Sequence, residues 1–302
     1  MDADKFLENI GVDEQIIIMS NCLKTICDGL FHLFYGWRRS KEEKDIPESD
    51  AIAQCILQIV VCKIRTLLIM CDGINITPEK GSVRILVIPS LISVLRSLYE
   101  MAFVFHNIYA EQDTIEERDI VLCIWEIRGQ NNRQNLQFVP LSFKKKEDNE
   151  KKLIENLKSR IITIATNLDM SDEVRKQLIN VASIKTVEIK GYRFKKDDEN
   201  KSIIAFKDYR YEEGAEILLG TDAPAYRFLS IHGHPSYLGV LQFGQTFNSE
   251  TDKNFLRTIL TCACKLASTI AMDYRERING AEDVFLQLNE NEKEYIKILC
   301  NS

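Results

Sequence analysis

The stretch SETDKNFLRTILTCACKLASTIAMDYRERING, residues 249–280, decides the fold class of this chain. Its first four residues resemble a capping box, and apolar side chains then recur every three or four positions from Phe255 to Tyr274. Gly280 follows the last periodic residue, where helices commonly end. The segment therefore predicts one long amphipathic helix.

The same helical period recurs along most of the 302 residues, so we expect an all-α fold. Besides 249–280, the expected helices span 13–39, about 50–70, 90–110, 113–134, 151–167, 171–182, 211–219, 223–233, 236–243 and 281–300. Thr77 and Pro78 give a further helix-start signal, and Pro89 is expected to kink that helix or to start a new one. Residues 136–143 are expected to form a crossing loop.

One region departs from the helical period. Residues 184–211 alternate β-branched and aromatic side chains around charged loops, which is typical of a short hairpin or an irregular insertion. The chain has 6 prolines and 13 glycines, too few for the turns of a many-stranded β fold. We therefore predict a multi-helix bundle, a single helical domain over residues 1–302 with its core at about 50–275, carrying an insertion near 184–211.

Charge and cysteine content narrow the class of protein. Lys and Arg number 39 against 45 Asp and Glu, a net charge of −6, which excludes a basic field over the whole protein for non-specific nucleic-acid capture. The nine cysteines are odd in number and form no CxxC, so we interpret them as reduced thiols. With no basic leader and no unbroken apolar span, we expect a cytoplasmic protein without membrane contact.

Common cofactor and nucleophile motifs are missing from the sequence. It contains no GxxxxGK[ST], no GxGxxG after an expected strand, no HExxH and no GxSxG. Readings as a P-loop ATPase, a dinucleotide oxidoreductase, a zinc protease or an α/β-hydrolase lose their main support. We expect no cofactor and no metal.

Two polar groups interrupt the apolar helices. Arg96 and Glu100 lie one turn apart on the expected 90–110 helix, where the guanidinium could bind an anion and the carboxylate could orient it. Tyr226, Ser230 and His234 recur every four residues and share a face if that segment is helical. Either group could also be a structural contact whose polar atoms are satisfied inside the bundle.

A third pattern is an arginine close to two histidines. Arg227 precedes His232 by five positions and His234 by seven. An imidazole with a pKa near 6.5 can exchange a proton with a 2′-hydroxyl or a leaving 5′-oxygen, and a guanidinium can stabilise charge at phosphorus. Such a pair is suited to RNA cleavage without a metal ion.

The segments LRSLYE (residues 95–100) and AYRFLSIHGHPS (residues 225–236) resemble a family of uncharacterised bacterial helical proteins. Its members carry Arg-x3-Glu on a long central helix and Tyr-x2-Leu-Ser-x3-His on a later helix, and the resemblance covers about residues 50–275. The matching residues in this chain are Arg96, Glu100, Tyr226, Leu229, Ser230 and His234.

That family is similar to the HEPN domains (higher eukaryotes and prokaryotes nucleotide-binding), which are helical and often dimeric. Many HEPN domains are metal-independent ribonucleases of toxin–antitoxin and phage-defence systems. The resemblance implies Arg227 as the phosphate stabiliser and His232 or His234 as the acid and base. It also implies RNA, a second copy of the chain and a cognate antitoxin or defence protein as partners. Phe228 departs from the pattern, because a polar residue usually follows the arginine.

Three hypotheses follow from these residues. The first is a HEPN-like ribonuclease or toxin-type defence effector that acts through Arg227, His232 and His234. The second is a non-catalytic module that binds a ligand or partner through Arg96, Glu100, Tyr226, Ser230 and His234. The third is a purely structural helical protein in which these polar groups only satisfy one another.

Overall fold

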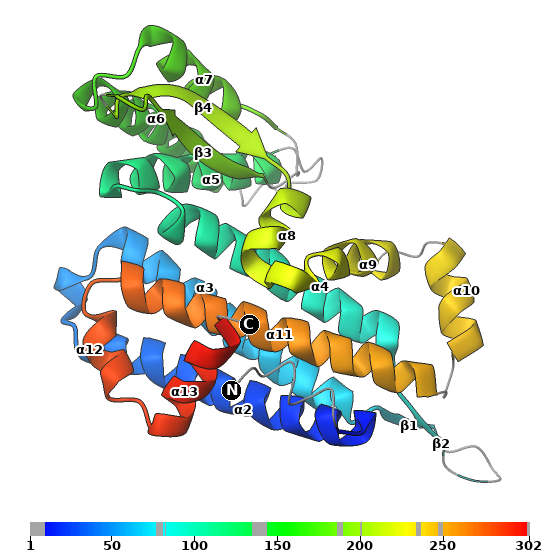
Figure 1. Cartoon of the computed structure of the whole chain (residues 1–302). Coiled ribbons are helices and arrows are strands. Elements are labelled where there is room, and N and C mark those ends of the chain that lie inside the picture. Colours follow the sequence, from blue (N-terminus) through cyan, green and yellow to red (C-terminus); the bar gives the residue numbers. More distant parts are fainter. Residues whose placement is uncertain are drawn as a thin grey trace. The chain divides into compact units, whose positions relative to one another are not determined.

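The computed structural model describes residues 10–76, 81, 83–134, 144–185, 190–199, 201–233, 237–246 and 250–300 (Figure 1). It confirms the predicted all-α multi-helix bundle with a small hairpin insertion. The chain forms two compact units. The first combines Met1–His106 with Glu212–Ser302, and the second is Asn107–Tyr211. The predicted single domain over residues 1–302 stays a prediction.

Four long helices build the first unit. They are α2 (Val12–Arg39), α3 (Glu48–Cys71), α4 (Ile88–Phe105) and α11 (Glu250–Arg277). Helix α3 packs between α2 and α4, and α11 packs against α2, α3 and α4 (Figure 1). Each helix turns one apolar stripe inward, as the sequence period predicts. The fully buried side chains with the largest volume in this unit include Leu23, Leu30, Trp37, Leu57, Ile64, Tyr99, Phe105, Tyr274 and Phe285.

Shorter helices cover this bundle. They are α8 (Tyr211–Leu219), the 3₁₀ turn η4 (Gly220–Asp222), α9 (Pro224–His232), α10 (Tyr237–Thr246), α12 (Ala281–Leu286) and α13 (Glu290–Cys300). A further 3₁₀ turn, η1 (Glu43–Asp45), joins α2 to α3. Helix α9 packs on α4, and α12 and α13 pack on α2 and α11.

The prediction of one helix over residues 281–300 is wrong, because a reciprocal cap separates α12 from α13. The Glu292 amide donates to Asn289 Oδ1 at 2.9 Å, and the Asn289 amide donates to Glu292 Oε2 at 3.2 Å. These bonds satisfy amides that a helix start leaves open. The buried Glu292 also lies 2.8 Å from His32 Nδ1 on α2, so the cap joins the chain's last helix to its first described one.

A second difference precedes α4. Strands β1 (Ile74–Ile76) and β2 (Val83–Ile85) pair antiparallel, with Asn75 opposite Arg84. A helix from Thr77, which lies outside the described residues, is therefore wrong across Val83–Ile85. Pro89 falls in the first turn of α4, where its missing N–H costs nothing, so it starts the helix.

The second unit packs α5 (Ile115–Gln134), α6 (Lys144–Asn167) and α7 (Asp172–Ala182) with a hairpin of β3 (Gly191–Lys196) and β4 (Ile203–Tyr209). The hairpin confirms the insertion predicted near residues 184–211. Helix α7 starts at Ser171, whose hydroxyl accepts the Val174 amide at 3.3 Å. The crossing loop predicted at 136–143 lies outside the described residues.

A buried polar network anchors this hairpin. The segment His106–Ala110, η2, is a π-helical turn that carries Asn107. Asn107 Nδ2 donates to the Tyr192 carbonyl at 2.9 Å, and the Tyr192 amide donates to Asn107 Oδ1 at 3.1 Å. The Tyr209 hydroxyl donates to Glu111, and burial, the larger cause, together with that carboxylate raises the pKa of Tyr209. The Asn107 side chain thus bonds to both the backbone N–H and the carbonyl of Tyr192, as a neighbouring strand would.

Four described helical segments are long and apolar enough to cross a membrane, by length and composition alone. They are Val12–Arg39, Glu48–Cys71, Ile88–Ala110 and Asp252–Arg277. The buried share of the most apolar 18-residue window ranges from 39% in Glu48–Cys71 to 72% in Asp252–Arg277. The cytoplasmic location stays a prediction.

Candidate functional site

Arg96 and Glu100 form the ion pair that their spacing indicates. Arg96 Nε lies 3.3 Å from Glu100 Oε1, and the two side chains are 21% and 32% exposed. They border the buried stripe of α4 that includes Leu95, Leu98 and Tyr99. Water can therefore reach both charges.

The two sequence motifs meet in the structure. The Tyr226 ring packs on Tyr99 with 4.6 Å between ring centroids. At the end of α9, a Cβ added to Gly233 would lie 3.2 Å from Arg96 Cδ. Residues 96 and 233 are far apart in sequence, yet the arginine stem passes beside the glycine backbone. The same Cβ would lie 2.7 Å from the Leu229 carbonyl oxygen, so a larger residue at position 233 would force a shift.

Charged side chains near the junction of α4 and α9 act on the pKa of Tyr226. Burial is the largest cause that raises the pKa of Tyr226; Arg96 lowers it, and Glu212 and Glu100 raise it further. The hydroxyl is therefore protonated at neutral pH and can donate a hydrogen bond. Ser230 lies one turn later on the same face of α9 and is half-buried.

His232 lies among aromatic rings. Its centroid is 4.3 Å from that of Phe228 and 6.3 Å from that of Phe255, and the two phenyl rings stack at 5.2 Å. All three side chains are half-buried. Burial lowers the pKa of His232, so the imidazole is neutral at pH 7.

Arg227 does not join this aromatic group. It is exposed on α9, and five positions of helix turn it by roughly 140° from His232. The arginine whose described contacts reach the segment after His232 is Arg96, through Gly233. His234 lies outside the described residues, so its role stays a prediction.

Two contacts that sequence reasoning missed hold α8 and α9 in place. A Cβ on Gly214 would lie 2.3 Å from the Phe103 ring, so α8 approaches α4 more closely than any other residue allows. Just before α9, Asp222 Oδ2 accepts from the buried Lys265 Nζ at 2.8 Å. The glycine within an expected helix and the lysine within an apolar stripe are the only sequence signals of these contacts.

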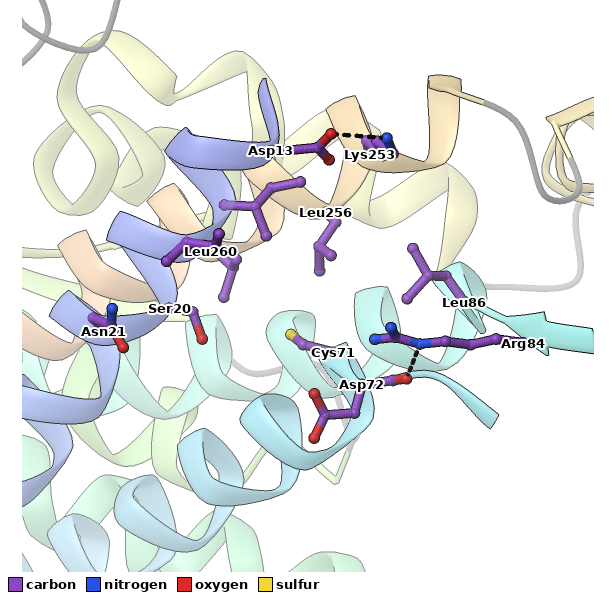
Figure 2. A pocket seen from close by; sticks show the side chains of 12 residues that line it. Asp13, Ser20, Asn21, Cys71, Asp72, Arg84, Leu86, Lys253, Leu256 and Leu260 are labelled. Carbon is purple, nitrogen blue, oxygen red and sulfur yellow. Dashed lines mark hydrogen bonds and ion pairs between the residues drawn. The ribbon is translucent and has the colours of Figure 1, made fainter. Parts of the chain in front are cut away.

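A cavity of about 500 Å³ opens at one end of the bundle (Figure 2). Ile16, Leu256 and Leu260 give it apolar walls, and the Asp13–Lys253 ion pair lies on its rim with 3.0 Å between Oδ2 and Nζ. No local motif marks this cavity, because its walls come from α2, α3, the β2 segment and α11.

The polar groups of the cavity are partly satisfied by the protein itself. Figure 2 shows Arg84 reaching across the end of α3, where its Nε donates to the Asp72 carbonyl. Burial, more than the Asp72 charge, raises the pKa of Cys71 to about 12, so this thiol is protonated at neutral pH. Among the described residues, no group of three or more His, Cys, Asp or Glu side chains has the arrangement of a metal site.

Comparison of the chain with family models, with curated proteins and with solved structures finds no match.

Proposed function

We propose that this chain is a binding module for a phosphate-bearing nucleotide or a short single-stranded RNA segment, held at the junction of α4 and α9. One observation carries the proposal. Arg96, a partly exposed arginine with an orienting carboxylate, lies against Gly233, and Gly233 directly follows His232, whose half-buried ring packs with Phe228 and Phe255.

The arginine–glutamate pair and the aromatic rings suit the two parts of a nucleotide, its phosphate and its base. A guanidinium presents a planar fork of donors that matches phosphate oxygens, and Glu100 fixes its orientation from one turn away. Half-buried aromatic rings offer a face on which a base can stack, a contact typically worth about 1–3 kcal/mol per base. The protein's net negative charge means that such affinity must come from local contacts.

Binding is favoured over cleavage by the positions of Arg227 and His232. They lie on different sides of α9, and the lowered pKa of His232 leaves little imidazolium at neutral pH to protonate a leaving oxygen. The neutral ring instead suits stacking and a single hydrogen bond.

Fluorescence anisotropy with a labelled single-stranded oligoribonucleotide and a labelled ATP analogue tests the proposal. Arg96→Gln keeps most of the side chain's length but removes its charge, and should weaken binding at least tenfold, about 1.4 kcal/mol. The matched control is Arg175→Gln, which also breaks an ion pair within one helix, with Asp172 on α7. Absence of binding by the wild type, or equal losses in both variants, refutes the proposal.

Metal-independent RNA cleavage, in a toxin-type defence effector, is the second candidate. It is supported by the proximity of Arg96 to Gly233, the residue that follows His232. In this case the wild type should cut labelled RNA in the presence of EDTA and slow growth when its expression is induced. Arg227→Ala and His234→Ala test the resemblance, and Arg96→Gln tests the arginine that the contacts favour. Intact RNA and normal growth for the wild type would exclude this candidate.

A further inference from the structure

Helix α3 carries two apolar stripes, and the bundle uses only one. The inner stripe, with Ala53, Leu57, Val60, Ile64 and Leu67, is fully buried. The outer stripe follows the same alternation of three- and four-residue steps. Its members are Ile52, Cys55, Ile59, Cys62, Thr66 and Ile69.

The outer stripe is open to solvent. Ile59 is 45% exposed and Ile69 is 72% exposed, and Cys55 and Cys62 are also exposed. An apolar repeat of three and four residues is the seam of a coiled coil, whose side chains insert between those of a second helix. From Ile52 to Ile69 the stripe runs roughly 26 Å along the helix, long enough for an interface between two globular proteins.

We propose that the outer stripe is where two copies of the chain associate, with the two α3 helices antiparallel across a two-fold axis. The stripe is self-complementary in this arrangement. With the axis midway between residues 60 and 61, Ile52 lies opposite Ile69 of the partner subunit, Cys55 opposite Thr66 and Ile59 opposite Cys62. Every member then meets another member, as a two-fold interface requires.

The charges beside the stripe fit the same register. Arg65 donates to Asp28 on α2, so its charge is already paired within each copy. Across the two-fold axis, Arg65 comes nearest to Gln58 of the partner subunit rather than to another arginine. Like charges therefore do not oppose one another, and the amide oxygen can accept from the guanidinium.

The hydroxyl groups next to the stripe can lose water at little cost. A groove of about 630 Å³ runs between α3 and α4 and is lined by Ile59, Cys62, Lys63, Thr66 and Ser93 among others. Within it, Lys63 Nζ donates to Ser97 Oγ at 2.6 Å, and the Thr66 and Ser93 hydroxyls donate to helix carbonyls at 2.9 Å. The two hydroxyls therefore leave no unpaired donor when a second copy covers them, whereas the charged Lys63 ammonium, which has further donors, belongs to the flank that stays in water.

Aromatic side chains extend the surface onto α2. Phe31 and Tyr35 stack with 5.4 Å between centroids, and both are exposed on the face of α2 that carries Asp28. The Asp28–Arg65 contact places that face beside α3. Aromatic rings at an interface commonly supply much of its binding energy.

Lipid fits this face less well than a second copy does. The Asp28–Arg65 pair, Gln58 and Lys63 would all enter hydrocarbon with the stripe, and each charge there is expensive. A protein partner can instead leave the charged flank in water.

Sedimentation velocity of the full chain tests the association. The wild type should sediment as a dimer at micromolar concentration, and Ile59→Lys should shift it to monomer, with at least tenfold weaker association. Ile204→Lys on β4 is the matched control, because Ile204 is 48% exposed, and it should stay dimeric. A monomeric wild type, or an Ile59→Lys variant that still dimerises, overturns the proposal.

Oxidative cross-linking tests the antiparallel register. In the Ile59→Cys variant, a mild oxidant should join position 59 to Cys62 of the partner subunit several-fold more efficiently than it cross-links the wild type, and peptide mass spectrometry identifies the linked positions. Exclusive links between identical positions would indicate parallel helices and overturn the register. Flotation of the wild type with phosphatidylcholine vesicles, abolished by Ile59→Lys, would assign the stripe to lipid and also overturn the proposal.

Discussion

At the scale of single residues, buried charges and rings fix how α9 sits on the bundle. Lys265 is almost fully buried in α11 and pairs with Asp222, the last residue of the turn before α9. Arg96 lies beside the residue that follows α9. These contacts at the two ends of α9 hold Tyr226 against Tyr99, and they connect local charge pairing with the geometry of the candidate site.

Removing the Asp222 charge should destabilise the protein. Asp222→Asn leaves the Lys265 ammonium buried with a weaker partner, and the free energy of unfolding should fall by about 1–3 kcal/mol, less than for a fully buried pair because Asp222 is partly exposed. Urea denaturation measures the change. Adding Lys265→Met to Asp222→Asn should recover part of the loss; a double variant less stable than Asp222→Asn alone would contradict this account.

His232 should make stability depend on pH. Because burial lowers its folded-state pKa below the unfolded value of about 6.5, the unfolded chain binds the proton more tightly. The contribution of the neutral ring is therefore complete above about pH 6.5 and is lost as the pH falls below it. His232→Phe keeps an aromatic ring beside Phe228 and does not titrate. Between about pH 7.5 and pH 5, the wild type should lose stability relative to this variant, whereas parallel curves would contradict the prediction.

At the scale of elements, small residues decide where helices and strands approach each other. The Cβ of an alanine at Gly191 would lie 2.2 Å from the Tyr209 ring, so β3 and β4 depend on this glycine. Gly129, exposed within α5, has no atom within 4 Å of the same point. Two glycines of one unit thus have opposite physical roles.

Substitution of these two glycines by alanine should change stability in opposite directions. Gly191→Ala should cost about 1–3 kcal/mol, since the Tyr209 ring must leave its place in the buried network. Gly129→Ala should add about 0.5–1 kcal/mol, because alanine loses less conformational freedom in a helix. Thermal denaturation followed by circular dichroism compares them. A neutral Gly191→Ala would mean that the hairpin repacks freely.

At the scale of the whole molecule, each compact unit has a core and one tryptophan of its own. Trp37 is fully buried in the first unit, and Trp125 lies on α5 in the second. The second unit is inserted between the two sequence segments of the first. Its core is built from α5, α6, α7 and the hairpin, including Ile124, Ile161 and Leu178. Two separate cores favour two unfolding transitions over one.

The tryptophans can report these transitions separately. In a Trp125→Phe background, fluorescence follows Trp37 alone, and adding Gly191→Ala should leave its urea midpoint unchanged. Far-ultraviolet circular dichroism of the same protein should show an earlier transition for the helices and hairpin of the second unit. If both signals shift together, the chain unfolds as a single cooperative domain, which is what the sequence analysis predicts.

The sequence by itself determined the helices and the local pairs along them. A 3.6-residue period fixes which side of a helix is apolar, so the long helices and the Arg96–Glu100 pair follow from short stretches of chain. The hairpin near residues 184–211 follows from the alternation of β-branched and aromatic side chains in that stretch. The break before α13 and the strand pairing before α4 were missed, because caps and a short hairpin override a weak period.

Only the tertiary structure decided which residues distant in sequence lie in contact. The approach of Gly233 to Arg96, the Lys265–Asp222 pair and the cavity between α2 and α11 join residues far apart in sequence, and no local pattern encodes such distances. The packing of α8 and α9 on α4 brings Gly233 to Arg96, with a close contact at Gly214, and the packing of α2, α3 and α11 forms the cavity. The physical reason is that periodicity specifies a face, whereas shape complementarity between faces selects the partner.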